Sequence, residues 1–425
     1  MRSLNPMARV KSGARRASSV ASLQSDWSMV LIGLYVFTFA VVTFKFPVAE
    51  IGIVVAVVGL FLQPEGIRAP AVFWWYAAFV LWAFIASFAS LFPEVARDQV
   101  IERVKQVIIL LVVVNALRTE KQIKTFALFF MLCFLLFPIR GAFVNYAVGE
   151  NVMGRMIWNY IYGNPNDLAA LCLLALGVAL SVAFAKSNQK FVQIGSRVIA
   201  ALVVAVIFFT QSRGAFLGLL FCMGPVLIWK MASRGRVLVY ALAGAIALFL
   251  LLPASVWERF SGIRQLTSTA TIAQADPEGS ADERWRIQKV GWRIFLDHPI
   301  VGTGLGTYRV INNMYAPELG RRDTHNTYLN LAAEVGLPGL ILWCAYFFTT
   351  LFGAMKMRRM REPGPASIQQ VWIERALASL LVAGIFGSYA ALTMPALILG
   401  LLWSSSTGLA AAHSTAEGNK ALGGR

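Results

Sequence analysis

A histidine with polar neighbours stands just before an apolar run in the second half of the chain. Asp323 lies two residues before His325, and Asn326 and Tyr328 follow it. The imidazole of histidine has an unperturbed pKa near neutrality, so it is well suited to take a proton at working pH. The three neighbours could orient the ring by hydrogen bonds. Alternatively, His325 is only a helix-entry residue, with Asn326 or Thr327 as the cap.

Three arginines are candidates for binding an anion. Arg213 lies in a tight turn between two apolar runs, and Arg284 and Arg286 begin an amphipathic segment. A rigidly held guanidinium can grip phosphate with paired N–H donors. The alternatives are that Arg213 reaches toward lipid headgroups, and that Arg284 and Arg286 belong to a solvated charged face.

The segments beside these residues receive structural interpretations. The spacing of apolar residues predicts a helix over 285–296, lying on the membrane surface or capping a helix bundle, and Pro299 explains its end. The glycines of 301–308 are interpreted as a flexible connector, because no βαβ unit surrounds them as a dinucleotide site would require. Residues 163–167 are expected to open a helix.

The composition is that of a membrane protein. The chain has 58% hydrophobic and 14% charged residues and a mean hydropathy of +0.64, whereas about a quarter of the residues of a soluble protein are charged. The net charge of +17 lies mostly in short loops, where it sets orientation, so nucleic-acid binding is not expected. The four cysteines fall in apolar runs, and no metal site is expected.

The apolar runs predict an all-α polytopic membrane protein of about twelve transmembrane helices. The expected spans are 27–44, 48–63, 71–92, 104–117, 125–139, 167–185, 191–210, 215–230, 237–256, 328–352, 371–393 and 395–412. The basic short connections then all fall on one side, which the positive-inside rule makes cytoplasmic. Both termini are therefore expected in the cytoplasm.

Three larger units follow from this division. Residues 1–26 form a basic cytoplasmic tail that could touch membrane lipids, 27–412 form the transmembrane domain, and 413–425 form a C-terminal cytoplasmic tail. A large outer loop at 257–327, which contains surface helices, joins spans nine and ten. The same count places Arg213 and the connection 140–166 on the outer face.

These residues resemble a known family. The segment 323–339 is similar to the His-Asn-x-Tyr-Leu…Glu-x-Gly-x-x-Gly stretch of the O-antigen ligase and polymerase superfamily, and 284–306 resembles the segment that precedes it. The turn around Arg213 and residues 163–167 occur in the family's order. The resemblance covers about 164–339, and the N-terminal spans match in hydropathy only.

The resemblance implies a bacterial inner-membrane glycosyltransferase with a periplasmic active site. Such a ligase takes O-antigen from undecaprenyl diphosphate and attaches it to a sugar hydroxyl of lipid A–core, without a cofactor or metal. The family's diphosphate-binding arginines correspond by order to Arg213 and Arg284, and its base corresponds to His325; Arg286 competes with Arg284 for the match. In-line attack would invert the anomeric configuration.

Other functions fit the same residues. An O-antigen polymerase or a protein O-glycosylation ligase of this superfamily would use the same kind of donor with a different acceptor. From another class, the chain could be a lipid-linked glycan flippase or a solute transporter. Transporters commonly carry paired repeats and polar groups at the bilayer midplane, whereas no repeat is detected in this sequence and the polar groups lie at the ends of its spans.

Overall fold

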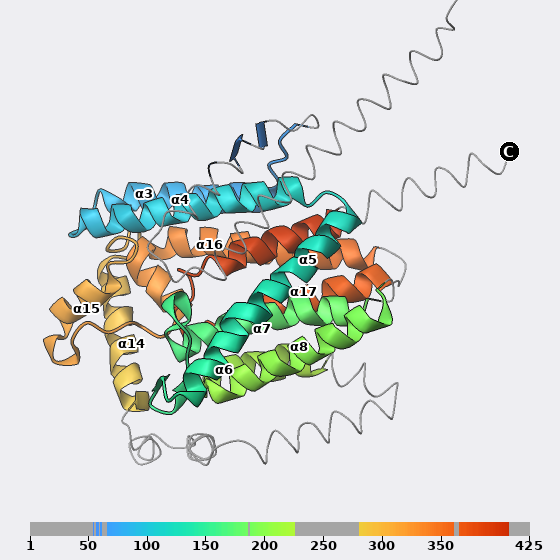
Figure 1. The fold of residues 1–425 in the computed structure, drawn as a ribbon. Helices are drawn as coiled ribbons and strands as arrows, with labels where there is room; N and C mark the ends of the chain where they lie inside the picture. The colour runs from blue at the N-terminus through green and yellow to red at the C-terminus, as the bar shows by residue number, and fades with distance from the viewer. Residues whose placement is uncertain are drawn as a thin grey trace, which may run out of the picture.

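The computed structural model describes residues 66–185, 188–225, 280–360 and 365–407, with a few positions between 54 and 61. The described part is almost entirely helical (Figure 1). Its longer helices are α3 (Ala71–Ser87), α4 (Pro93–Ala116), α5 (Glu120–Phe134), α7 (Pro165–Ala183), α8 (Lys190–Phe209), α14 (Ser280–Asp297), α16 (Thr327–Arg359), α17 (Pro365–Ala383) and a last helix, Met394–Thr407.

Short elements occupy the connections. They are the π-helical turns η1 (Leu135–Ile139) and η3 (Leu219–Met223), the helices α6 (Arg140–Ala147), α9 (Arg213–Gly218) and α15 (Tyr308–Tyr315), the 3-10 turns η2 (Tyr160–Tyr162) and η5 (Pro317–Leu319), and an antiparallel hairpin of β1 (Asn151–Val152) and β2 (Arg155–Met156). Because η1 and η3 continue α5 and α9, they bend helices rather than end them.

Helix α7 is the centre of one half of the bundle. Nearly every residue from Leu168 to Ala183 is buried, as expected of a helix that is apolar all round. It contacts α5, α8, α9 and α17, while α16 packs with α3 and α17. Gly177 permits a close approach of α7 to α17, because a Cβ there would lie 2.3 Å from the Cβ of Ala376 in α17.

Four of the described helical segments are long and apolar enough to cross a membrane: Glu120–Ala147, Pro165–Ala183, Lys190–Phe209 and Thr327–Arg359. Three shorter apolar helices, Ala71–Ser87, Arg213–Met223 and Met394–Thr407, accompany them. An all-α membrane protein is therefore confirmed, whereas the count of twelve spans is not. The expected spans at 27–44 and 237–256, and most of the one at 48–63, lie outside the described residues.

Several expected helix ends are wrong. The helix expected to begin at residue 104 begins at Pro93 instead. The span expected to stop at residue 139 continues through Pro138, in η1, as far as Ala147. A π-helical turn leaves room for a proline ring that the regular helix would exclude. The span expected at 371–393 ends at Ala383 instead, and the segment 384–393 is a connection held by the start of α16: Thr327 N–H donates to Gly384 O over 2.7 Å.

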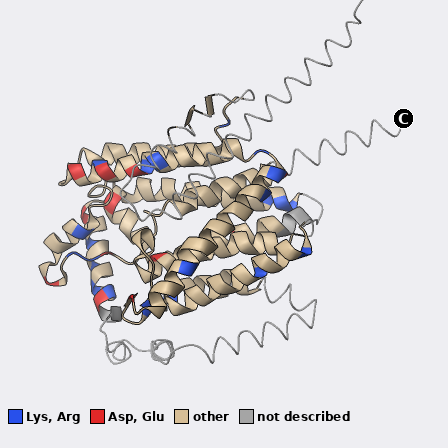
Figure 2. Cartoon of the chain, in the orientation of Figure 1, with Lys and Arg blue, Asp and Glu red and all other residues tan. Residues whose placement is uncertain are grey.

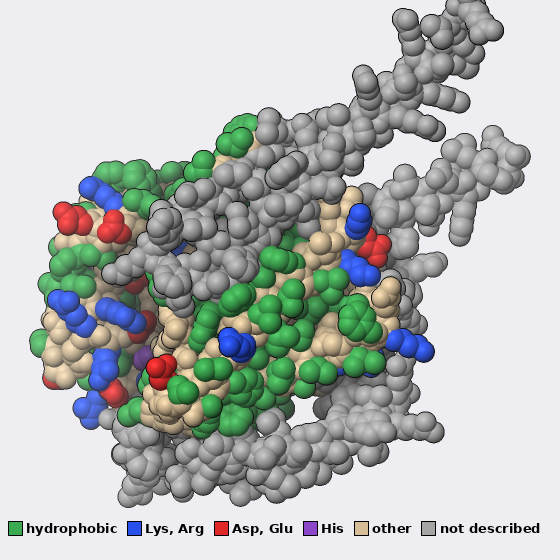
Figure 3. Space-filling model, in the orientation of Figure 1, with side chains coloured by type: hydrophobic (Ala, Val, Ile, Leu, Met, Phe, Trp, Pro, Cys, Tyr) green, Lys and Arg blue, Asp and Glu red, His purple; other side chains and the backbone are tan. Residues whose placement is uncertain are grey.

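The connections predicted for the outer face meet at one end of the bundle. Helix α14 runs across this end and packs with α16, and the turn between α4 and α5 lies at the opposite end (Figure 1). Most charged side chains gather at the two ends, with apolar helix between them (Figure 2). In the space-filling view, apolar side chains cover much of the exposed face between the ends, and Lys and Arg cluster over α14 and α15 (Figure 3).

Candidate functional site

His325 is held in an unusual backbone conformation directly before α16. Its φ is 51°, a left-handed value that few non-glycine residues adopt. The following residue, Asn326, caps the helix, since its Oδ1 accepts from the N–H groups of Tyr328 at 3.0 Å and Leu329 at 3.1 Å. Thr324 Oγ1 accepts from Asn326 N–H. The hydrogen bonds of Thr324 and Asn326, on either side of His325, fix its backbone at the start of α16.

Four charged side chains surround the half-buried imidazole. Burial and the Arg284 guanidinium lower the pKa of His325 below its usual value, and Arg309 acts in the same direction. Asp323 and Glu283 oppose this shift. A lowered pKa keeps the ring neutral at neutral pH, which leaves a ring nitrogen able to accept a proton.

Asp323 is anchored by two contacts of its own. Its Oδ2 pairs with the Arg309 guanidinium over 3.3 Å, and its Oδ1 accepts from the Ser388 hydroxyl over 2.7 Å. The first partner comes from α15 and the second from the segment after α17. The carboxylate therefore connects three elements beside His325, and it tunes the charge around the ring.

The structure places Arg284 of α14, rather than Arg286, close to His325. Arg284 is half-buried and Arg286 is exposed, and only Arg284 is among the charges that act on the imidazole. The opposite face of α14 is buried: Ile287 and Ile294 pack with Tyr308 and Ala333. This packing confirms that the helix predicted at 285–296 caps the bundle, although it begins earlier, at Ser280.

Arg213 begins α9 at the same end of the molecule. The preceding Gln211 has a φ of 54°, so the turn is sharp. Gly214 packs closely against the end of α17, because a Cβ there would lie 2.8 Å from the Cβ of Phe386. Arg213 itself is half-buried. Its neighbour Ser212 forms a side-chain hydrogen bond with Tyr389, and the charge of Arg284 acts on the same phenol.

Asn326 and Tyr328 have structural roles in the described contacts. Asn326 is the helix cap, and the Tyr328 hydroxyl donates to Leu381 O over 2.7 Å, which ties α16 to α17. These bonds place the first turn of α16 and, through it, His325. An orienting role of Tyr328 on the imidazole stays a prediction.

Sequence reasoning missed four polar residues of this end: Arg155, Asp167, Arg309 and Tyr389. Arg155, in β2, donates to Thr210 O and to Asn166 Oδ1, both over 2.8 Å. The charges of Arg155 and Asp167 act on Tyr389. None lies in the segment 323–339, and Tyr389 fell inside an expected span. Asp167 was treated only as part of a helix start.

The glycine-containing segment 301–308 is not a flexible connector in this structure. Gly302, Gly304 and Gly306 all have positive φ, and their segment packs against a kink in α16. Thr303 N–H donates to Ala333 O over 3.0 Å, and Gly304 N–H donates to Glu334 O over 2.8 Å. The earlier interpretation is wrong because glycine here serves tight turns and close backbone contact.

Glu334 fixes this segment from inside α16. Its buried carboxylate accepts from Tyr308 N–H over 3.1 Å, from Gly306 N–H and from the Asn330 side chain. The Glu334 carboxylate thus accepts hydrogen bonds from backbone N–H groups of the loop. Since 301–308 follows α14 directly, these bonds help set the position of α14, and of Arg284, relative to His325.

Among the described residues, no group of three or more His, Cys, Asp and Glu side chains is arranged to hold a metal ion. The expectation of a metal-independent reaction stays a prediction.

Fold and site together describe a helical membrane protein whose polar groups converge at one end of its bundle. Residues 198–344 of the chain match a family model described as O-antigen ligase. The match includes Arg213, Arg284 and His325, and it confirms the family resemblance for this part of the sequence. The similarity to this family therefore covers the part of the chain that holds the candidate site. No curated protein matches the chain significantly.

Proposed function

We propose that this chain is an inner-membrane glycosyltransferase that ligates O-antigen polysaccharide from undecaprenyl diphosphate onto a sugar hydroxyl of lipid A–core. The transfer takes place on the periplasmic side, inverts the anomeric centre and needs no metal. The observation that carries this proposal is His325, a half-buried imidazole whose pKa is lowered by burial and by Arg284.

In the proposed reaction, His325 removes a proton from the acceptor hydroxyl as its oxygen attacks the anomeric carbon of the donor glycan. A new C–O glycosidic bond forms, and the bond from the anomeric carbon to the diphosphate oxygen breaks. The electron pair of that bond leaves with undecaprenyl diphosphate, and His325 keeps the proton until solvent takes it. A general base of this kind contributes roughly two to four orders of magnitude in rate.

Arg213 and Arg284 are the proposed ligands of the leaving diphosphate. Negative charge grows on its bridging oxygen in the transition state, and fixed guanidinium donors stabilise such charge without reorganising. The location of Arg284 near the imidazole supports this assignment, because base and leaving group must lie on opposite sides of one sugar ring. Asp323 and Arg309 also act on the imidazole: the carboxylate raises the pKa of His325, and the guanidinium lowers it.

The test is the glycan profile of envelope lipopolysaccharide in a deletion strain, complemented with wild type or with His325→Ala. We expect deletion to remove all polymer from lipid A–core while polyprenyl-linked polymer accumulates, and only the wild type should restore it. A core capped with one repeat would identify a polymerase instead. An unchanged lipopolysaccharide with loss of a glycosylated protein would identify a protein ligase.

Purified protein provides the direct measurement. Polyprenyl-diphosphate-linked glycan and lipid A–core are incubated with the protein in detergent, with or without excess chelator. We expect equal transfer in both samples. Activity that disappears with chelator and returns with Mg²⁺ would contradict the metal-independent mechanism.

A further inference from the structure

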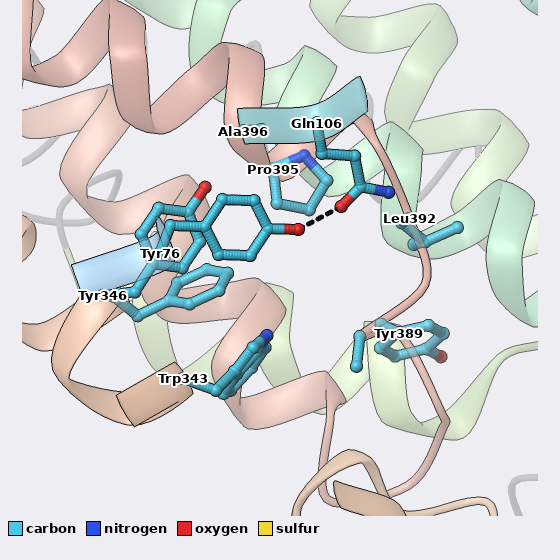
Figure 4. Close-up of a pocket in the computed structure, with 10 residues that line it drawn as sticks. Tyr76, Gln106, Trp343, Tyr346, Tyr389, Leu392, Pro395 and Ala396 are labelled. Atoms are coloured by element: carbon cyan, nitrogen blue, oxygen red, sulfur yellow. Dashed lines mark hydrogen bonds between the residues drawn. The ribbon is translucent and has the colours of Figure 1, made fainter. Parts of the chain in front are cut away.

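Tyr389 lies in the segment 384–393, between α17 and the last helix. The ring is buried at 4% exposure and lines an aromatic pocket with Tyr76, Trp343 and Tyr346 (Figure 4). Its hydroxyl points away from Tyr76 and Tyr346 in this view. The ring therefore packs among the aromatic side chains of the bundle, and the hydroxyl extends away from them.

The backbone of Tyr389 is bonded to the start of α16. Tyr389 N–H donates to Thr327 Oγ1 over 2.9 Å, and the same hydroxyl donates to Gly387 O over 2.7 Å. Thr327 is buried and lies two residues after His325. The position of Tyr389 is thus set by the same turn that positions the imidazole.

A second anchor holds the other side of this segment. The buried Arg103 of α4 donates to Ala391 O over 2.9 Å, and Gln106 donates to the same oxygen over 3.1 Å and accepts from the Tyr76 hydroxyl. A buried guanidinium bound to a backbone carbonyl is costly to displace. Because both sides are anchored, Tyr389 has little freedom to move.

The phenol extends from this rigid segment to the turn that carries Arg213. It is hydrogen-bonded to the Ser212 side chain, and the charges of Arg284, Arg155 and Asp167 act on it. Ser212 is itself buried and directly precedes Arg213. One side chain therefore connects the turn before α16 to the turn before α9.

We propose that Tyr389 is a positioning residue that sets the distance between His325 and Arg213, through its backbone bond to Thr327 and its phenol bond to Ser212. The inference rests on the proposed glycosyl transfer, in which the base and the diphosphate ligand must bracket one sugar ring. A misplacement of about 1 Å can cost about 100-fold in rate, so a rigid spacer between the two turns has a direct effect on catalysis.

The test compares Tyr389→Phe with Tyr346→Phe in the purified transfer assay. Tyr346 lines the same pocket, and its hydroxyl has no hydrogen-bond partner among the described residues, so its removal controls for loss of a buried phenol oxygen. We expect kcat of Tyr389→Phe to fall about 10- to 100-fold, with thermal stability in detergent similar to that of the control, whose kcat stays near wild type. Equal kcat values in the two variants would overturn the proposal.

A double-mutant cycle separates positioning from general destabilisation. If the phenol acts through Ser212, adding Tyr389→Phe to Ser212→Ala should slow transfer little further, and Ser212→Thr, which keeps a hydroxyl, should restore most of the rate. Multiplicative losses would show independent roles and contradict the inference. If the wild-type protein transfers no glycan, the proposed function fails; if the wild type is active and Tyr389→Phe matches it, the positioning role alone fails.

Discussion

At the scale of single residues, His325 combines a strained backbone with a ring whose neighbours favour its neutral form. In the proposed reaction its replacement should remove general-base catalysis, so His325→Ala should slow transfer by roughly two to four orders of magnitude while membrane insertion is kept. His325→Gln, which can form hydrogen bonds but takes no proton at neutral pH, should be almost as slow. The measurement is initial rate with purified protein.

His298 gives the matched control. It follows α14 and is half-buried, and we expect His298→Gln to transfer glycan at the wild-type rate. Rapid turnover by His325→Gln would show that the ring only positions the acceptor. Wild-type turnover by His325→Ala would show that His325 is only a structural residue at the start of α16.

The charge of Arg284 predicts a change in pH dependence. Because Arg284 lowers the pKa of His325, the neutral base should persist below the ordinary histidine pKa of about 6.5, and kcat/KM should decline only at more acidic pH. Arg284→Gln removes that positive charge, so the pKa should rise and the acidic limb of the pH profile should move to higher pH. The rate at the optimum should also drop, since a diphosphate ligand is lost.

Arg286→Gln is the control for this profile, because it removes an equal charge two residues away at an exposed position of the same helix. We expect its acidic limb to coincide with that of the wild type. Coincident limbs for Arg284→Gln and the wild type would refute the electrostatic coupling between Arg284 and His325.

The residues that sequence reasoning found and missed differ in one respect. His325 lies in a recognisable motif and Arg284 lies in the segment before it. Arg284 is one of the charged side chains around the His325 imidazole. Arg309 and Tyr389 carry no local signal: the first is one of many arginines in a basic loop, and the second is a tyrosine in an apolar stretch. Their importance arises from contacts made across long sequence separations, which spacing alone does not reveal.

At the scale of elements, the interlock of the segment 299–308 with α16 fixes the geometry of the site. Gly336 breaks the helical pattern of α16, with φ 67° and ψ −175°, and Leu337 N–H donates to Pro299 O over 2.8 Å. A Cβ on Gly336 would lie 1.9 Å from Ile300 O. The kink therefore exists where the incoming backbone touches the helix.

Alanine at Gly336 should be strongly destabilising. Such a φ and ψ combination costs a side-chain-bearing residue about 1–3 kcal/mol, and the clash with Ile300 O adds to it. We expect Gly336→Ala to lower the melting temperature in detergent and to reduce transfer, as measured by thermal unfolding and the transfer assay.

Two further glycines separate strain from clash. Gly320 has nearly the same backbone angles, φ 67° and ψ −162°, but a Cβ there meets nothing within 4 Å, so Gly320→Ala should show the strain alone. Gly353 lies in α16 and is also uncrowded, so Gly353→Ala should be close to neutral. A Gly336→Ala protein as stable as Gly320→Ala would show that the contact with Ile300 contributes nothing.

Helix existence was easier to predict than helix ends. Apolar periodicity located the helix at 285–296, and the Asp-His-Pro sequence after it gave its end at Asp297. The end of α6 was wrong because the helix continues past Arg140, where the apolar run ends. The end of α17 was wrong because the apolar run continues past Ala383, where the helix has ended. At residues 384–393 the decisive interactions are hydrogen bonds from the N–H and the hydroxyl of Thr327 to backbone carbonyls of the segment, and composition does not report them.

At the scale of the whole molecule, the helices alternate in direction, so that the predicted outer connections share one end with α14 (Figure 1). Hydropathy and loop charge were enough to predict this alternation over the described helices. They could not predict which connections fold into a site. The segment 301–308, the hairpin and the segment 384–393 are short, and they share no pattern of charge. The division into tails at 1–26 and 413–425 and a membrane domain stays a proposal.

The proposed orientation gives the last prediction. If the polar end faces the periplasm, a cysteine at Asn151, exposed in β1, should react with a membrane-impermeant maleimide in intact spheroplasts. A cysteine at Lys121, exposed in the first turn of α5 at the opposite end, should react only after the membrane is opened. Three of the four native cysteines are buried and one is half-buried, and labelling of the parent protein measures their background.

Reporter fusions extend the same test to the remaining chain. A fusion at Glu417 should report the cytoplasm, and an insertion within 266–281 should report the periplasm, because an even number of spans places both termini inside and the large loop outside. Labelling of Lys121→Cys but not Asn151→Cys in intact spheroplasts would show that the membrane orientation is opposite to the proposed one. His325 would then face the cytoplasm, away from a periplasmic acceptor, and the proposed ligation could not proceed as described.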